Sequence, residues 1–257
     1  MPNMPKNIRI IPRLDIKGPN VVKGIHTEGL RVVGKPIKLA KKYYRDGADE
    51  IFYMDIVASL YQRNLDLELL RSVASEVFIP LTVGGGIRSI HDINNVLRAG
   101  ADKVAINTYA IRHPQFLREA VRTFGAQCIV LSVEAKKINP SSWEAYTDGG
   151  RERTGLDAIK WIKQAIQQGI GEILLTSIDT DGTRKGYDTD LCKAVTSFSK
   201  VPVVIHGGGG ALKSFSDAYA TCNPDAISAS TVFHYGDLSI KNLKNYLSSK
   251  KIKIRTE

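Results

Sequence analysis

Acidic side chains end several short apolar runs of this sequence. Asp15 ends one run near the N-terminus and Glu134 ends another, and a lysine follows two residues later in each case, at Lys17 and Lys136. If both runs are strands that end at the same edge of a sheet, the two carboxylates can lie on opposite sides of one bound molecule. Such a pair can serve as general acid and base, with pKa values set by burial and neighbouring charges. The simpler alternative is that each carboxylate only pairs with its nearby lysine.

Two glycine clusters offer a place for phosphate groups. Residues 84–86 and 207–210 are all glycine, and backbone N–H groups without side chains can point at phosphate oxygens. The next apolar runs end in polar residues, Asn107 and Thr108 after the first cluster, and Ser230 and Thr231 after the second. The pattern favours two phosphate sites and a substrate phosphorylated at both ends, although glycine runs also occur as simple tight turns.

A third group of charged residues begins apolar runs instead of ending them. Its members are Arg9, Glu50, Lys103 and Glu172. Two are positive and two are negative, so a ring of salt bridges that closes one end of the fold is the simplest interpretation. A gate that admits a small molecule from a partner subunit is the alternative, and spacing alone does not separate the two.

These residues need a scaffold that brings the ends of the apolar runs together. Eight runs are predicted strands, at 8–16, 50–55, 80–83, 103–107, 128–133, 172–178, 201–205 and 226–229. Segments of helical periodicity alternate with them, at 36–46, 65–76, 90–100, 115–124, 155–169, 191–198, 212–221 and 240–249. Alternation predicts an α/β fold with a parallel sheet, and eight units can close into a (β/α)8 TIM barrel. The loops after the strands would then form the active face.

The sequence also repeats itself at long period. Residues 47–51 resemble 169–173, 79–83 resemble 201–205, and 101–108 resemble 224–231. The repeat spans four strand–helix units, which predicts a single barrel domain, 1–257, made of half-barrels at approximately 1–125 and 126–257. An open, doubly wound sheet does not predict this symmetry, so the barrel is the preferred fold.

Composition limits the class of partner and the compartment. A net charge of +10 would attract a nucleic acid, a membrane surface or a small phosphorylated molecule, but the cations are spread through the chain, so we expect no nucleic-acid binding. No apolar stretch has the length of a signal peptide core or a membrane span, so we expect a cytoplasmic protein that does not bind a membrane. Cys128, Cys192 and Cys222 stand singly, which predicts reduced core cysteines, no metal site and no redox cofactor.

Several motifs resemble the cyclase subunit of imidazole glycerol phosphate synthase. They are Ile-Ile-Pro-Arg-Leu-Asp-Ile at 10–16, Val-Val-Lys-Gly at 21–24, Pro-Leu-Thr-Val-Gly-Gly-Gly-Ile-Arg at 80–88 and Thr-Ser-Ile-Asp-Thr-Asp-Gly at 176–182. The similarity covers nearly the whole chain. The related isomerase of the same pathway shares the half-barrel symmetry, but the motifs at 21–24 and 176–182 resemble the cyclase.

The resemblance implies a reaction of histidine biosynthesis that needs no cofactor. A partner glutaminase would make ammonia, which would pass through a tunnel in the barrel and attack a bisphosphorylated formimino-ribulosyl aminoimidazole carboxamide ribonucleotide. The products would be imidazole glycerol phosphate and aminoimidazole carboxamide ribotide.

The resemblance also implies roles for individual residues. Asp15 would be the principal acid/base, Glu134 the second catalytic carboxylate, and Lys23 would help to hold the substrate. One phosphate site would consist of Gly86, Asn107 and Thr108, and the other of Asp181, Gly182, Gly208, Ala229 and Ser230. The ammonia gate would be formed by Arg9, Glu50, Lys103 and Glu172.

The chain departs from the family pattern near these residues. Glu134 stands where the family has an aspartate, and Arg13 and His206 replace small residues. The departures leave two alternatives open. One is a paralogue that uses ammonia to amidinate or aminate another substrate, such as a nucleotide sugar for surface polysaccharide. The other is a non-catalytic barrel that binds and activates a glutaminase.

Overall fold

Eight parallel strands form a closed barrel, as the sequence predicts. The computed structural model describes residues 7–255, so the ends of the predicted domain, 1–6 and 256–257, lie outside the described residues. Pairing of β10 with β7 closes the ring of strands. In ring order, the strands are β1 (Arg9–Lys17), β4 (Ile51–Asp55), β5 (Leu81–Gly84), β6 (Lys103–Ile106), β7 (Ile129–Asn139), β10 (Glu172–Ser177), β11 (Val203–His206) and β12 (Ala226–Ala229).

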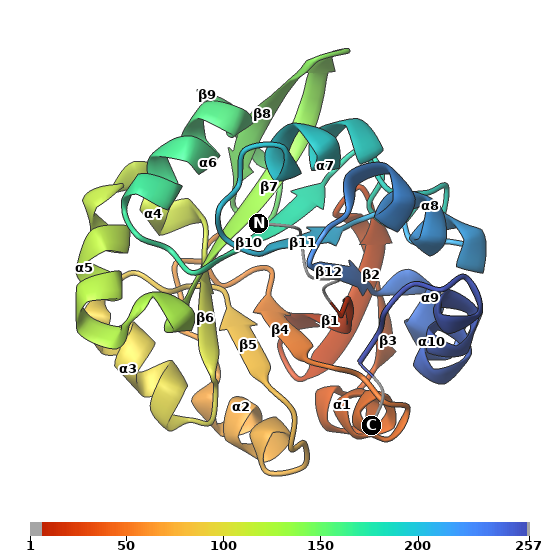
Figure 1. Cartoon of the computed structure of the whole chain (residues 1–257). Coiled ribbons are helices and arrows are strands. Elements are labelled where there is room, and N and C mark those ends of the chain that lie inside the picture. The colour runs from red at the N-terminus through yellow and green to blue at the C-terminus, as the bar shows by residue number, and fades with distance from the viewer. Residues whose placement is uncertain (1–6, 256–257) are drawn as a thin grey trace.

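Helices surround the central strands (Figure 1). They are α1 (Pro36–Arg45), α2 (Leu67–Ala74), α3 (Ile90–Arg98), α4 (Thr108–Arg112), α5 (Gln115–Phe124), α6 (Ala158–Gln167), α7 (Thr189–Thr196), α8 (Leu212–Cys222), α9 (Thr231–His234) and α10 (Ile240–Ser249), with a short 3-10 helix η1 (Ala126–Cys128). The short helices α4 and α9 follow β6 and β12 and were not predicted. The remaining eight α-helices confirm the predicted helical segments.

Two hairpins extend the barrel at opposite strands. The first consists of β2 (Asn20–Ile25) and β3 (Glu28–Gly34), and the second of β8 (Ser142–Thr147) and β9 (Glu152–Asp157). Strand β2 pairs antiparallel with β1, and β8 pairs antiparallel with β7. The prediction of a helix from residue 155 was wrong in its first turn, because 155–157 belong to β9 and the Asp157 side chain caps α6 by accepting from Lys160 N.

The barrel has a separate apolar interior. Alternate residues of each strand point inward, and Ile11, Phe52, Met54, Ala105, Val130, Leu174, Val204 and Ala226 form one buried cluster there. A second and larger cluster lies between the strands and the helices. The inner cluster separates the charged residues that begin the strands from the polar residues that end them.

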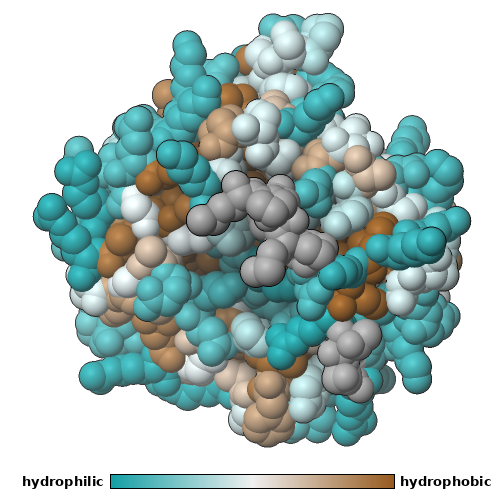
Figure 2. Space-filling view, in the orientation of Figure 1, coloured by the Kyte–Doolittle hydropathy of each residue, from teal (hydrophilic) through white to brown (hydrophobic). Residues whose placement is uncertain are grey.

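The outer surface seen in Figure 2 is mainly hydrophilic, and outside the grey atoms its apolar areas are separate patches. Among residues 7–255, no helix combines the length and apolar character required to cross a membrane.

The cysteines do not match the prediction of three reduced residues. Cys192 of α7 and Cys222 of α8 form a disulfide, and Cys128 is free. The helices α7 and α8 pack together, which brings the two Cα atoms to 5.9 Å although the residues are 30 positions apart. Singly spaced cysteines in a sequence give no indication of such a pairing.

Candidate active site

The two predicted carboxylates lie at the mouth of the barrel, where its strands end. Asp15 comes from β1 and Glu134 from β7, and these strands stand opposite each other in the ring. Asp15 is 4% exposed and Glu134 is 7% exposed. Both line one small void between the two sides of the mouth. The structure therefore brings the pair together as the sequence predicts, but it gives the two groups different surroundings.

Asp15 has a cation on each of its carboxylate oxygens. Arg13 Nε donates to Oδ1 at 2.7 Å, and Lys23 Nζ donates to Oδ2 at 3.0 Å. Burial would raise the pKa of Asp15, but Arg13 and Lys23 outweigh burial and lower this pKa to about 2. Pairing with Lys17 was a wrong alternative, because its side chain is exposed and the partners are Arg13 and Lys23. Asp15 is therefore a fixed carboxylate near neutral pH.

The ion pairs continue from Lys23 to the second half of the barrel. Lys23 Nζ lies 2.8 Å from Asp181 Oδ2, and both side chains are buried. His206 Nδ1 contacts Ser228 Oγ at 3.1 Å, and His206 Nε2 lies 3.4 Å from Asp181 Oδ1. Burial, together with the charge of Arg13, lowers the pKa of His206, so the imidazole is neutral near pH 7.

Glu134 has few partners by comparison. Its Oε2 accepts one hydrogen bond at 3.0 Å from Asn107 Nδ2, which also donates to Tyr146 O. Burial raises the pKa of Glu134 to about 7, although the charge of Arg13 and a hydrogen bond from the backbone N–H of Gly150 act in the opposite direction. Lys136 does not pair with Glu134, because its ammonium lies over the Tyr146 ring. Glu134 can therefore gain or lose a proton near neutral pH.

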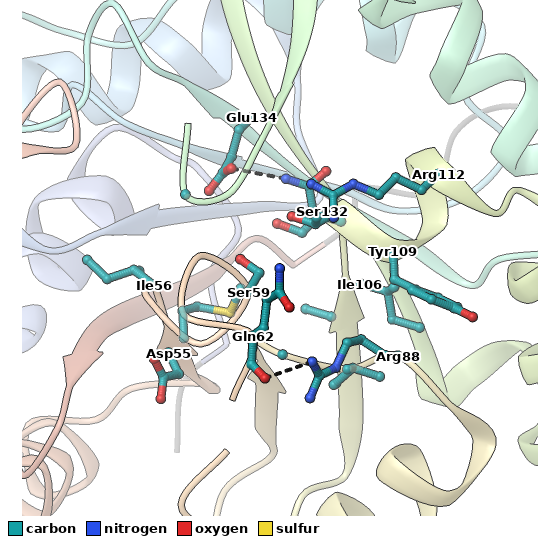
Figure 3. A pocket seen from close by; sticks show the side chains of 18 of the residues that line it. Asp55, Ile56, Ser59, Gln62, Arg88, Ile106, Tyr109, Arg112, Ser132 and Glu134 are labelled. Atoms are coloured by element: carbon teal, nitrogen blue, oxygen red, sulfur yellow. Dashed lines mark hydrogen bonds between the residues drawn. The ribbon is translucent and has the colours of Figure 1, made fainter. Parts of the chain in front are cut away.

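A cavity of about 300 Å³ opens beside Glu134. Figure 3 shows Glu134 on one side of it, with Gln62 and Arg88 on the other. The predicted residues of the first phosphate site, Gly86, Asn107 and Thr108, also line this cavity. The Asn107 amide nitrogen is occupied by Glu134 and Tyr146, so this side chain positions the carboxylate instead of offering that nitrogen to a phosphate.

The residues predicted for the second phosphate site also come together, but they pack against the chain. Gly186 N donates to Gly208 O at 2.8 Å, and a Cβ added at Gly208 would lie 2.0 Å from Gly186 O. Ser230 Oγ donates to Arg13 O, and Ala229 is buried. A Cβ at Gly182 would lie 2.3 Å from Gly24 O of the first hairpin. The loop after β10 therefore covers this site.

Within residues 7–255, a small void lies between the covered site and Glu134. It measures about 10 Å³ and is lined by Arg13, Asp15, Lys23, Asp181 and Glu134, among others. A water molecule needs roughly 10–15 Å³ of such volume. The second half of the mouth is therefore filled by side chains and loop, while the first half is open.

The four charged residues that begin the strands form a closed ring at the opposite end of the barrel. Arg9 pairs with Glu50 at 2.7 Å and also with Glu172. Lys103 pairs with Glu50 at 3.0 Å and with Glu172 at 2.8 Å. The predicted ring of salt bridges is confirmed, and each cation bridges both carboxylates.

Sequence reasoning missed several residues that line the cavity. Ser59 and Gln62 follow β4, and Tyr109 and Arg112 lie on α4. Nothing in the pattern of apolar runs distinguishes these positions. Arg88 also lines the cavity, and its place two residues after the glycine cluster was a usable signal that was not given a role.

Comparison with known proteins gives consistent matches over most of the chain. Residues 9–239 match the family described as "Histidine biosynthesis protein". "Imidazole glycerol phosphate synthase subunit HisF" of Helicobacter hepaticus is 48% identical over 96% of this chain and 98% of its own length. The protein of the same name from Legionella pneumophila is 55% identical over 82% of this chain and 99% of its own length. The protein of the same name from Clostridium beijerinckii is 47% identical over 96% of this chain and 98% of its own length.

Proposed function

The chain belongs to the histidine biosynthesis protein family, and on this premise we propose that it is the cyclase subunit of an imidazole glycerol phosphate synthase. Its substrate would be the bisphosphorylated formimino-ribulosyl ribonucleotide, and its nitrogen source would be ammonia from a partner glutaminase. The observation that carries the proposal is the cavity beside Glu134, which places a carboxylate and a glycine cluster around one space at the active face of the barrel.

One terminal phosphate would bind at the glycine cluster of this cavity. Gly85 and Gly86 line it with positive φ angles of 110° and 69°, a backbone conformation that glycine adopts readily. The second phosphate would bind at Gly208 and Ser230, where the loop after β10 now packs. Binding of the whole substrate would therefore require this loop to move.

We assign the proton transfers mainly to Glu134. Addition of ammonia leaves a positive nitrogen that must lose a proton, and cleavage of the adduct needs a proton donor. A carboxyl with a pKa of about 7 can perform both tasks near neutral pH. Asp15 would instead remain ionised and hold Arg13 and Lys23 in place.

The ring of Arg9, Glu50, Lys103 and Glu172 would act as the ammonia gate. Above the ring lies the apolar interior of the barrel, which favours neutral ammonia over the ammonium ion. Opening the ring would require at least one of its ion pairs to break. The glutaminase would dock on this end of the barrel, because the ammonia must enter there.

Turnover of the bisphosphorylated substrate by the purified chain, with saturating ammonium salt, tests the function. Robust loss of substrate would support the cyclase, whereas no turnover from folded protein would contradict it. In the second case, binding of a glutaminase without turnover would indicate the non-catalytic alternative. Conversion of a nucleotide sugar would indicate the paralogue. Lys103→Met tests the gate separately, because it should alter glutamine-dependent turnover more than ammonium-dependent turnover.

A further inference from the structure

Two arginines line the open cavity beyond the residues already discussed. Arg88 follows the first glycine cluster, and Arg112 ends α4. Figure 3 shows both side chains reaching toward the middle of the cavity. Neither residue takes part in the proposed proton transfers.

Among residues 7–255 the guanidinium of Arg88 pairs with no carboxylate, although Asp92 Oδ2 accepts from the Arg88 backbone N–H at 3.0 Å. This guanidinium donates to two neutral oxygens, Gln62 O at 2.9 Å and Asn64 Oδ1 at 2.6 Å. Within residues 7–255 it forms no ion pair with a side chain, and it is only half-buried. The cavity carboxylate Asp55 is paired with Arg63 at 2.7 Å. Arg88 therefore offers a positive charge to whatever occupies the cavity.

Arg112 is held in place but retains donors. One nitrogen donates to Asp148 Oδ2 at 2.9 Å, and the arginine side chain is still 57% exposed. Asp148 is itself positioned by its backbone N–H, which donates to Thr108 Oγ1 at 3.0 Å. The buried carboxylate thus orients the guanidinium at the cavity, while its other donors remain available for a ligand.

The second half of the barrel carries a glycine cluster without equivalent arginines. Both halves carry a glycine cluster, but the position equivalent to Arg88 in the repeat is Gly210, and that equivalent to Arg112 is Tyr235. The arginines are therefore an addition to the open half. A cavity of about 300 Å³ also provides more space than one phosphate group needs.

We propose that Arg88 and Arg112 form an anion subsite next to the glycine cluster, so that the open half of the barrel accepts a small molecule carrying a diphosphate group. The glycine N–H groups would bind one phosphoryl group, and the two guanidinium groups would bind the next, since arginine matches phosphate geometry well. This inference goes beyond the proposed function, whose substrate carries its two phosphates at opposite ends.

Calorimetric titration of the purified chain with inorganic phosphate and with diphosphate, in chelator-containing buffer of constant ionic strength, tests the subsite. We expect diphosphate to bind at least about tenfold more tightly than phosphate. Arg88→Gln and Arg112→Gln should each remove about tenfold of the diphosphate affinity and change phosphate affinity much less. Arg98→Gln on α3, an exposed arginine that does not line the cavity, is the matched control and should change neither.

Equal affinity for the two anions would overturn the subsite, and so would an equal loss of both affinities in Arg88→Gln. Thermal unfolding of each variant checks that the fold is intact, and Arg88→Lys, which keeps the charge, should retain part of the preference for diphosphate. If diphosphate is not preferred but the bisphosphorylated ribonucleotide is turned over, only this inference fails. If neither phosphate nor the ribonucleotide binds, the proposed function fails as well.

Discussion

The two halves of the barrel mouth are built on the same sequence repeat, but one half holds an open cavity and the other is filled. On the open side, the inward-facing residues nearest the mouth are Met54, Gly84, Ala105 and Ser132, of which Met54 and Ala105 belong to the apolar interior. The repeat places Thr176, His206, Ser228 and Arg13 at the equivalent positions. Each of these four residues is larger or more polar than its counterpart, and they contact one another or Asp181. These side chains, together with the loop after β10, thus fill the second half, while the first half holds a cavity.

The same contrast separates the two carboxylates. Asp15 faces two cations and stays ionised, whereas Glu134 faces the open cavity with the Asn107 amide and the Gly150 backbone N–H as donors. Groups in one site whose environments move their pKa values apart are suited to different tasks. Under the proposed function, the filled half would therefore supply electrostatic positioning and the open half proton exchange.

Of the changes considered, removal of the Glu134 carboxyl should have the largest effect on turnover. Glu134→Gln keeps the size of the side chain but cannot exchange protons, so kcat with ammonium salt should fall about 10²–10⁴-fold. Glu134→Asp is the matched control, because it keeps the carboxyl and should retain more activity than the glutamine variant. Near-normal turnover by Glu134→Gln would contradict the proposal that the open half carries the proton exchange.

Asp15→Asn should lower the stability of the fold. The change leaves Arg13 and Lys23 buried beside Asp181 with one carboxylate fewer, which should cost about 3–5 kcal/mol in the free energy of unfolding at pH 7. Because the pKa of Asp15 is lowered to about 2 from its usual 3.8, the stabilisation is complete above pH 3.8 and is lost as the pH falls through 2. Urea denaturation of both proteins from pH 7 downward measures this. An unchanged stability at pH 7 would contradict the structural role.

Glu134→Gln should change the free energy of unfolding in the opposite direction, and should stabilise the fold at high pH. The pKa of Glu134 is raised to about 7 from 4.5 by burial, so the wild-type fold loses stability as the pH rises from 4.5 through 7. Glutamine does not ionise, and the variant should therefore gain up to about 3 kcal/mol relative to wild type between pH 4.5 and pH 8. Urea denaturation at the two pH values gives this difference. A relative loss at pH 8 would show that Glu134 is stabilised as a carboxylate.

Much of this arrangement could be predicted from the sequence, and the reasons for the omissions are physical. The apolar runs identify the eight strands because barrel strands are buried on both faces. The strands β3 and β9 escaped notice because most of their residues are exposed. The ends of the strands identified Asp15 and Glu134, but not their partners. Lys23 reaches Asp15 from a hairpin that was not predicted, and Arg13 lies two residues away on the same face of β1.

The smallest predicted effects are the stability losses caused by alanine in each of the two glycine clusters. A Cβ at Gly208 would lie 2.0 Å from Gly186 O, whereas a Cβ at Gly86 would lie 2.7 Å from Arg63 O, and both glycines have positive φ. Each alanine variant should lose on the order of 1–3 kcal/mol of stability, with the larger loss at Gly208. Gly86→Ala should in addition raise KM, because its backbone lines the open cavity. Thermal unfolding and KM measurements separate the two outcomes, and a larger stability loss at Gly86 would reverse the comparison.

The pH dependence of kcat/KM with ammonium salt tests most directly whether Glu134 exchanges the proton. Ionisation of ammonia and of the substrate phosphates is the same for every variant, so differences between variants isolate the protein group. We predict a limb with an apparent pKa of about 7 in the wild type. This limb should move in Glu134→Asp and persist in folded Asp15→Asn. A limb that is unchanged in Glu134→Asp and is lost in Asp15→Asn would indicate that Asp15 transfers the proton. That result would contradict the assignment of proton exchange to Glu134.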